Sequence, residues 1–221
     1  MKIMKWLNKL SEARISFYTY KLNINDCIIY NYELFNSNTR SFIVISGLLY
    51  LQKVFLNGEK LCIAILTRDT LLHLDFNNIS KKLYYYQLIS LNTSYIISLC
   101  NNDLYAKKKQ HIILNMHKGY CKTLIAYEKM IHILTHKYIK YRVIQLLLFL
   151  SIEEGNIINN TIIIPFYISQ SSIGNIVGSN KNTINKIIKA LEKQKIICYS
   201  NYKRRIIIKD IIGLNKAKLI L

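Results

Sequence analysis

Lysine and asparagine side chains between residues 181 and 189 have the most distinctive chemistry in this sequence. Their spacing (i, i+1, i+4, i+5, i+8) places them along one face of a helix: Lys181, Asn182, Asn185, Lys186 and Lys189. Lysine donates hydrogen bonds to guanine O6 and N7 or to phosphate oxygens, and asparagine pairs with adenine N6 and N7. The face contains no acidic residue, so it predicts a surface that binds double-stranded DNA.

Two short helices must position that face. The first follows Ser169, a plausible N-cap, and ends at Gly178, where a left-handed residue commonly closes a helix. Ser179 or Asn180 can cap the second helix, whose buried face consists of Ile184, Ile187, Ile188 and Leu191. Residues 195–210 then predict a hairpin whose basic residues can touch the DNA backbone: Lys203, Arg204 and Arg205. This order predicts a winged helix-turn-helix.

The charge of the chain agrees with a polyanionic partner. The formal net charge is +19, and residues 169–221 contain eleven basic and two acidic residues, which gives +9. Such an excess favours nucleic acid, although an anionic membrane surface or an ordinary solvated basic surface also fits. The abundance of Ile, Asn, Lys and Tyr indicates A/T-rich codons, so part of the lysine content reflects genome composition.

Upstream of the helices, the first hundred residues have the pattern of short strands. Asn25-Asp26 marks one turn, and Asn57-Gly58 predicts a hairpin, so a β-barrel or β-sandwich is expected. From about 112 to 151 the period becomes helical, as one long helix or two with a break near Tyr138, and either a dimer seam or a plain core helix fits it. Residues 153–160 have the pattern of a polar loop, and residues 161–167 that of a short strand.

Enzyme chemistry finds little support. His132 and His136 stand at i, i+4, a spacing found in metal sites, but no HExxH motif and no third ligand lies close by. A metal-dependent barrel would need more histidines than His73, the single one between residues 20 and 100. The sequence also lacks a glycine-rich phosphate loop and a nucleophile elbow. We therefore expect no catalytic residues and no metal.

Cysteine usage and hydropathy bound the environment. The five cysteines are odd in number and form no CxxC pair, which argues against disulfides, zinc and iron–sulfur clusters and fits a reducing compartment: Cys27, Cys62, Cys100, Cys121 and Cys198. The N-terminus is too polar for a signal peptide, and the most apolar run, residues 143–152, is about half as long as a membrane span. We expect a soluble protein without a membrane partner.

The stretch "IPFYISQSSIGNIVGSNKNTINKIIKALEKQKII" resembles the DNA-binding domain of the cyclic-AMP receptor protein (Crp–Fnr) family. The resemblance rests on the leading proline, the Ser-Gln cap, the Ile-Gly pair, Gly-Ser in the turn, the threonine and the Leu-Glu pair: Pro165, Ser169, Gln170, Ile173, Gly174, Gly178, Ser179, Thr183, Leu191 and Glu192. It extends upstream over almost the whole chain. Within the family the sequence is most similar to the global nitrogen regulators, in the version encoded in red-algal plastids.

The resemblance implies an α+β fold in three parts. Residues 1–111 would form a double-stranded β-helix, the cyclic-nucleotide-binding-like β-roll. Residues 112–139 would form a long dimerisation helix, and residues 140–221 the winged helix-turn-helix. A homodimer would then bind palindromic promoter sites and contact RNA polymerase, in a plastid stroma or a bacterial cytoplasm.

The resemblance also assigns DNA contacts. The base-reading positions of the family fall on Lys181, Asn182 and Lys186, and two of them are usually arginine. Thr183 fits a contact to backbone phosphate. Together with the caps and the wing, the expected DNA-binding set is Ser169, Gln170, Ser179, Lys181, Asn182, Thr183, Asn185, Lys186, Lys203, Arg204 and Arg205.

The expected effector is less clearly marked. Cyclic-nucleotide binders of the family need Gly-Glu and then Arg-Ser or Arg-Thr, and residues 71–88 contain neither, so cyclic AMP is not expected. The nitrogen regulators hold 2-oxoglutarate with a Glu that matches Glu128 and an Arg whose position is Thr123, beside Lys122. Glu128 and Lys122 are therefore the candidate effector residues, and the effector is 2-oxoglutarate or none. The alternative is an effector-independent architectural protein that binds DNA or RNA.

Overall fold

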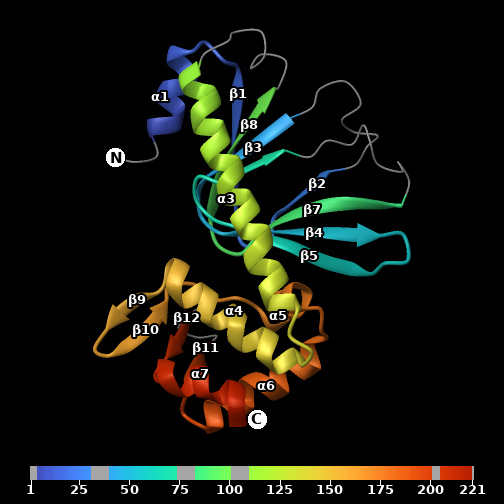
Figure 1. Ribbon diagram of the computed structural model, residues 1–221, viewed down its shortest axis with the longest axis vertical. Coiled ribbons are helices and arrows are strands. Elements are labelled where there is room, and N and C mark those ends of the chain that lie inside the picture. Colours follow the sequence, from blue (N-terminus) through green and yellow to red (C-terminus); the bar gives the residue numbers. More distant parts are fainter. Residues whose placement is uncertain (1–3, 31–39, 74–82, 101–109, 201–204, 221) are drawn as a thin grey trace. The chain divides into compact units, whose positions relative to one another are not determined.

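The computed structural model describes residues 4–30, 40–73, 83–100, 110–200 and 205–220 (Figure 1). The chain divides into two compact units, Met1–Lys129 and Met130–Leu221, and helix α3 runs through the boundary between them. Each unit is described by itself below.

The described residues of the first unit form two four-stranded antiparallel sheets and two helices. One sheet has the order β1-β8-β3-β6 and the other β2-β7-β4-β5. Because β1 and β2 lie in different sheets, as do β3 and β4, the chain alternates between sheets in the manner of the expected double-stranded β-helix. The bounds are α1 (Met4–Glu12), β1 (Phe17–Leu22), β2 (Cys27–Tyr30), β3 (Arg40–Ser46), β4 (Leu49–Phe55), β5 (Lys60–Leu66), β6 (Leu71–His73), β7 (Tyr84–Ser90), β8 (Ser94–Cys100) and α3 (Gln110–Leu134).

Turn residues determine where the chain changes sheet. Asn25 has a φ of 68° and separates β1 from β2, but the two strands form no hairpin, since β1 pairs with β8 and β2 with β7. Gly47 has a φ of 95°, and a Cβ there would lie 2.2 Å from Ser94 Oγ, so only glycine fits this crossover. The hairpin expected at Asn57-Gly58 is confirmed, because β4 and β5 pair around it.

Two apolar clusters hold the first unit together. One fills the space between the sheets: Leu22, Phe42, Val44, Leu49, Leu51, Ala64, Leu66, Leu72, Leu88, Ile96 and Ala126. The other packs α1 and the start of α3 against strands β3, β6 and β8: Trp6, Leu10, Ala13, Ile15, Ile43, Ile45, Leu71, Ile97, Leu99, Ile112 and Met116. The second cluster explains why α1 forms, although the sequence analysis expected no helix there.

The helical pattern of residues 112–151 fitted either one long helix or two with a break near Tyr138. The chain forms two helices, with a break at residues 135–138. The buried side of α3 recurs every three or four residues and consists of Ile112, Met116, Thr123, Ala126, Met130 and Ile133.

In the second unit, the described residues combine the helices α4 to α7 with a four-stranded antiparallel sheet of order β11-β12-β10-β9. Helix α4 is its centre, because it contacts α5, α6, α7 and β10. The bounds are α4 (Ile139–Glu154), β9 (Asn156–Ile158), β10 (Thr161–Ile164), α5 (Gln170–Val177), α6 (Lys181–Lys193), β11 (Ile197–Ser200), β12 (Arg205–Ile208) and α7 (Ile211–Ile220).

Two features of the second unit differ from the expectation. Residues 153–160 are not all loop, since 156–158 form β9, which pairs with β10 around Asn159 and Asn160 with φ of 47° and 59°. Two consecutive left-handed residues make a tight hairpin turn. All three residues of β9 are exposed, so the strand has no alternation of apolar and polar residues that would predict it. Helix α7 was not expected either.

No helix of the described residues is both long and apolar enough to cross a membrane.

Candidate DNA interface

Helix α5 and its turn are held by local hydrogen bonds. Ser169 caps α5, because its hydroxyl accepts from the Ser172 N–H at 3.0 Å. Gly178 ends the helix with a φ of 72°, and the Ser179 N–H donates to Gly174 O at 2.9 Å. A Cβ on Gly174 would lie 2.5 Å from Ser179 O, so the turn folds tightly onto the helix.

Helix α6 begins at Asn180, whose side chain accepts from the Thr183 N–H at 2.8 Å. This settles which of the two candidate residues caps the helix. Ile184, Ile188 and Leu191 are buried, whereas Ile187 is only half-buried. One side of α6 is therefore fastened to the unit by apolar contacts.

The opposite side of α6 is bare. Lys181, Asn182 and Lys186 are exposed, and their side chains make no hydrogen bond or ion pair with the described part of the chain. Asn185 is half-buried, and its Oδ1 accepts from Gln170 Nε2 at 3.2 Å, which links α6 to α5. We call Lys181, Asn182 and Lys186 the reading face. It can offer ammonium and amide donors to base edges or phosphates.

The wing has the expected hairpin strands, since β11 and β12 pair from Ile197 with Ile208 to Ser200 with Arg205. Arg205 is half-buried at the start of β12. Lys203 and Arg204 lie outside the described residues. The structure therefore provides the strands that would carry a basic wing.

Tyr199 is engaged within the second unit. Its hydroxyl donates to Ile168 O, its ring centroid lies 5.0 Å from that of Tyr167, and its N–H donates to Glu192 Oε1 at 2.8 Å. Burial raises the pKa of the Tyr199 phenol, and a hydrogen bond with Tyr167 adds to the rise. A ring used in this way is not free to stack on RNA bases, which is what the architectural alternative needs. Tyr202 lies outside the described residues.

Arg142 on α4 is a positioning residue, and no local sequence pattern marks it. Its Nη1 donates to Val177 O at 3.1 Å, at the C-terminus of α5, and its Nε donates to His136 O at 2.8 Å, in the connection between α3 and α4. A cation suits the negative end of the α5 dipole. The planar guanidinium serves both carbonyls at once with donors held in a fixed geometry.

The structure does not bring the two candidate effector residues together. Lys122 Nζ lies 3.3 Å from Asp69 Oδ2, on the outer surface of the first unit. Glu128 is exposed, six residues further along α3, which turns it about 120° away around the helix axis. Thr123, where the resemblance expected an arginine, is buried and donates to Leu71 O at 2.7 Å.

Aromatic side chains line the side of the β-roll where Tyr86 and Tyr127 pack on the inter-sheet cluster. The Tyr84 and Tyr86 ring centroids lie 5.4 Å apart, and Lys53 Nζ lies 3.4 Å from the Tyr84 centroid. Burial raises the pKa of Tyr86, as does a hydrogen bond with Tyr84, and burial raises the pKa of Tyr127. This lining is phenolic and apolar, which suits a doubly charged ligand poorly.

The paired histidines on α3 and the following residues form no metal cluster. The His132 and His136 ring centroids are 5.8 Å apart, and the described residues contain no group of three potential ligands among His, Cys, Asp and Glu. Cys27, Cys62, Cys121 and Cys198 are free thiols.

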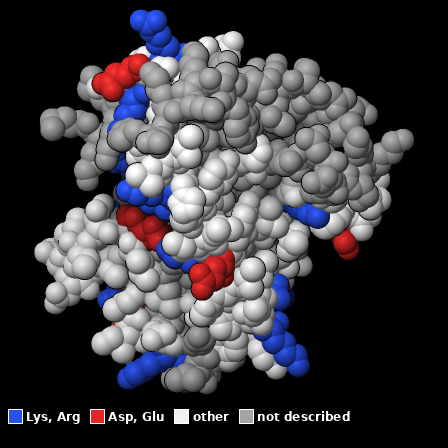
Figure 2. Space-filling view, turned by 45° about the horizontal axis from the view of Figure 1, so that its top comes forward, with Lys and Arg blue, Asp and Glu red and all other residues white. Residues whose placement is uncertain are grey.

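These features define a class of protein: a helix-turn-helix DNA-binding unit that follows a β-roll and a long helix. Figure 2 shows basic side chains reaching the surface at several places on one face, with fewer acidic ones among them. Residues 141–217 match the model of the Crp-like helix-turn-helix domain.

The chain is 32% identical over 219 residues to the ycf28 protein of Porphyra purpurea, which is named provisionally as an HTH-type transcriptional regulator. That match covers 96% of this chain and 86% of the relative. The chain belongs to the Crp–Fnr family of transcription regulators, whose members are not enzymes.

Solved structures share the fold. A CooA variant from Carboxydothermus hydrogenoformans has a TM-score of 0.71 at 15% identity and covers 99% of this chain and 96% of its own. TTHB099, a CRP-family regulator from Thermus thermophilus, has a TM-score of 0.69 at 12% identity, with 91% and 97% covered.

We predict that Arg142→Met destabilises the protein by about 1–3 kcal/mol, because two charge-assisted hydrogen bonds are lost while the packing of the stem remains. Chemical unfolding measures this loss. Arg142→Lys should restore only part of it, because an ammonium cannot reach both carbonyls in the geometry of a fork. An Arg142→Met protein as stable as the parent would contradict the role of Arg142 in holding α5.

Proposed function

We propose that this protein is a homodimeric, sequence-specific transcription regulator that reads palindromic promoter sites with α6. The observation that carries the proposal is the reading face, which is exposed and unpaired while the other side of α6 is buried. Two such helices in a dimer would enter successive major grooves about 34 Å apart. Phosphate contacts from the basic surface would add affinity, and contact with RNA polymerase would follow at the promoter.

A second apolar side of α3 supports the dimer. Its exposed residues lie away from the stripe that packs on the β-roll: Ile113, Leu114, Leu124, Ile125 and Ile131. Leu114, Cys121, Leu124 and Ile131 fall at the a and d spacing of a coiled-coil seam, which also includes the polar residues His117 and Glu128, and Leu124 is 64% exposed. An exposed apolar row of this length on one helix is explained by a second copy of the same helix.

We further propose that the protein acts in nitrogen control and is located in a plastid stroma, with a bacterial cytoplasm as the alternative location. They rest on the resemblance to global nitrogen regulators and on the A/T-driven composition. For the effector, we propose that the protein responds weakly or not at all to 2-oxoglutarate. Support comes from Thr123, whose hydroxyl is used on Leu71 O, and from Lys122, which lies against Asp69.

Lys186→Ala should weaken binding to a palindromic promoter far more than binding to random duplex, because base contacts carry the discrimination. We expect a loss of roughly 1–3 kcal/mol on the palindrome, measured by titration of labelled DNA. Lys193→Ala is the matched control, since Lys193 is exposed on the same side of α6 two turns further on. Equal losses on the two DNAs would refute base readout by Lys186.

Leu124→Glu should dissociate the dimer, because it places a carboxylate in the apolar seam of both copies. Sedimentation equilibrium measures the change, and DNA affinity should fall with it. Lys129→Glu, on the same helix beside the seam, is expected to leave the dimer intact. A dimer that survives Leu124→Glu would rule out α3 as the seam.

Calorimetry with 2-oxoglutarate is expected to give the same heat for the parent protein and for Glu128→Ala, because the described residues offer a dicarboxylate no paired positive charge inside the β-roll. Selection of bound genomic DNA with and without 2-oxoglutarate should give the same palindrome. Tight binding that Glu128→Ala abolishes would overturn this expectation and restore the effector pair.

A further inference from the structure

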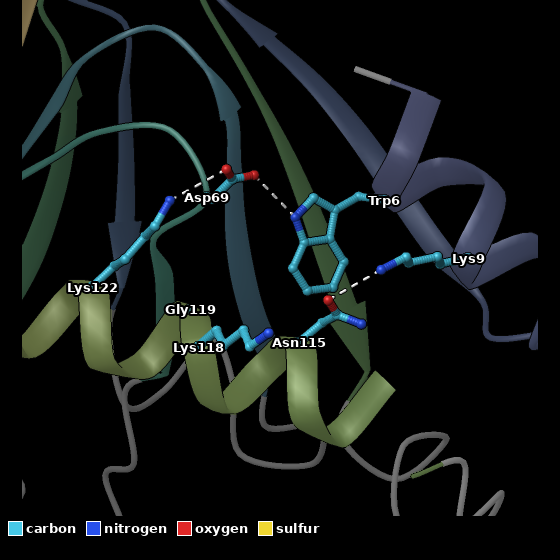
Figure 3. A pocket seen from close by; sticks show the side chains of 7 residues that line it. All are labelled: Trp6, Lys9, Asp69, Asn115, Lys118, Gly119 and Lys122. Carbon is cyan, nitrogen blue, oxygen red and sulfur yellow. Dashed lines mark hydrogen bonds and ion pairs between the residues drawn. The ribbon is translucent and has the colours of Figure 1, made fainter. Parts of the chain in front are cut away.

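A pocket of about 180 Å³ opens on the outer surface of the first unit, between α1, the turn after β5 and the N-terminal half of α3 (Figure 3). Six side chains from these three segments line it: Trp6, Lys9, Asp69, Asn115, Lys118 and Lys122. None of its residues belongs to the aromatic lining of the β-roll or to the reading face, and neither proposed activity uses the pocket.

Hydrogen bonds between the segments fix the walls of the pocket. Trp6 Nε1 donates to Asp69 Oδ1 at 3.2 Å, and Lys122 Nζ donates to Asp69 Oδ2 at 3.3 Å. Lys9 Nζ donates to Asn115 Oδ1 at 3.1 Å. Figure 3 shows the indole of Trp6 between the Lys122–Asp69 pair and the Lys9–Asn115 pair, so Lys9 and Lys122 are held at separate sides of the pocket.

The charge of the pocket is unbalanced. Three ammonium groups face one carboxylate, which leaves a formal charge of +2. Both oxygens of Asp69 already accept hydrogen bonds. Lys118 makes no hydrogen bond or ion pair with the described residues. Ammonium groups arranged in this way suit the oxygens of a phosphate or a carboxylate, to which each can donate as a compact charge.

We propose that this pocket binds a small anion with two negative charges, whose phosphate or carboxylate oxygens accept hydrogen bonds from Lys9, Lys118 and Lys122. Such an anion would bridge α1 and α3. It would also neutralise Lys118 and Lys122, which lie next to the exposed apolar row of α3. An effect on the dimer therefore rests on the proposed function, whereas the binding itself does not.

A purely structural role for the same residues makes a different prediction. In that case the hydrogen bonds only fasten α1 to α3, and any substitution that breaks them loosens the pocket. If the pocket is a ligand site, removing a lysine weakens anion binding and removing the charge of Asp69 strengthens it, because the lysines attract the anion and Asp69 repels it. Asp69→Asn keeps an acceptor for Trp6, and asparagine tolerates the φ of 63° at this position.

Trp6 is the only tryptophan in the chain, so its indole N–H resonance and its emission report on this pocket alone. The full-length protein is titrated with inorganic phosphate and, separately, with succinate, each against chloride at constant ionic strength. We expect a saturable shift of the Trp6 N–H resonance, and the comparison of the two anions identifies which oxygen chemistry the pocket prefers. Phosphate that binds the reading face leaves this resonance unchanged.

Lys118→Gln should weaken the binding of the anion about tenfold, since one charge-assisted hydrogen bond is lost. Its unfolding midpoint without anion should not change, because Lys118 has no partner to lose among the described residues. Asp69→Asn should tighten binding, and Lys129→Gln, outside the pocket on α3, should leave it unchanged.

Three results would overturn the proposal: no saturable shift beyond chloride with either anion, an equal loss in Lys129→Gln, or weaker binding in Asp69→Asn as well as in Lys118→Gln. The last would mean that the residues act only as a fastening. Promoter binding is measured separately on DNA, so failure of the anion site leaves the proposed regulator untouched.

Discussion

Helix α6 can present a bare polar side only because its other side is buried. Ile184, Ile188 and Leu191 are each at most 1% exposed, and such burial contributes about 1.5–3 kcal/mol per side chain. The contacts hold the helix without using any donor of the reading face. The turn at Gly174 and Ser179, the Asn180 cap and the Arg142 guanidinium then determine where α6 begins and how α5 lies against it. The position of the reading face thus depends on apolar packing and on hydrogen bonds within the second unit.

The same division of a helix into a buried and an exposed side recurs in α3, with a different outcome. One side of α3 packs on the β-roll through residues such as Met116 and Ala126, and another side leaves Leu124 and Ile131 exposed. In α6 the exposed side is polar, so water satisfies it until DNA replaces the water. In α3 the exposed row is apolar, and in the proposed dimer a second copy of the helix would remove that surface from solvent. The chemistry of the exposed side therefore distinguishes a nucleic-acid contact from a protein contact on two helices of similar geometry.

Periodicity and turn residues were sufficient to predict the helix pair and the wing strands, because each depends on patterns within about twenty residues. For the first hundred residues they predicted only a β-barrel or β-sandwich, and the double-stranded β-helix followed from the resemblance to the Crp–Fnr family. The hairpin at Asn57-Gly58 and the cap at Ser169 are local in this sense. Partnerships over long distances were not accessible: α1 is stabilised by strands β3, β6 and β8, far along the chain, and Arg142 reaches a carbonyl 35 positions away. Sequence position alone also did not show which way the side chains of residues 122 and 123 point. One residue is a rotation of about 100° on a helix, so Thr123 points at β6 while Lys122 points out to Asp69.

The lysines of the reading face imply a particular balance between affinity and discrimination. An ammonium carries the same charge as a guanidinium, so the counterion release that drives binding is preserved. It lacks the planar pair of donors that matches guanine O6 and N7, so one wrong base costs less. With a net charge of +19, we expect strong non-specific attachment to DNA at low salt, so in the proposed dimer selectivity would come from the spacing of two half-sites. The apolar row of α3 would then matter to sequence recognition as much as the reading face, because without a fixed pair of α6 helices a lysine contact alone would separate one site from another only weakly.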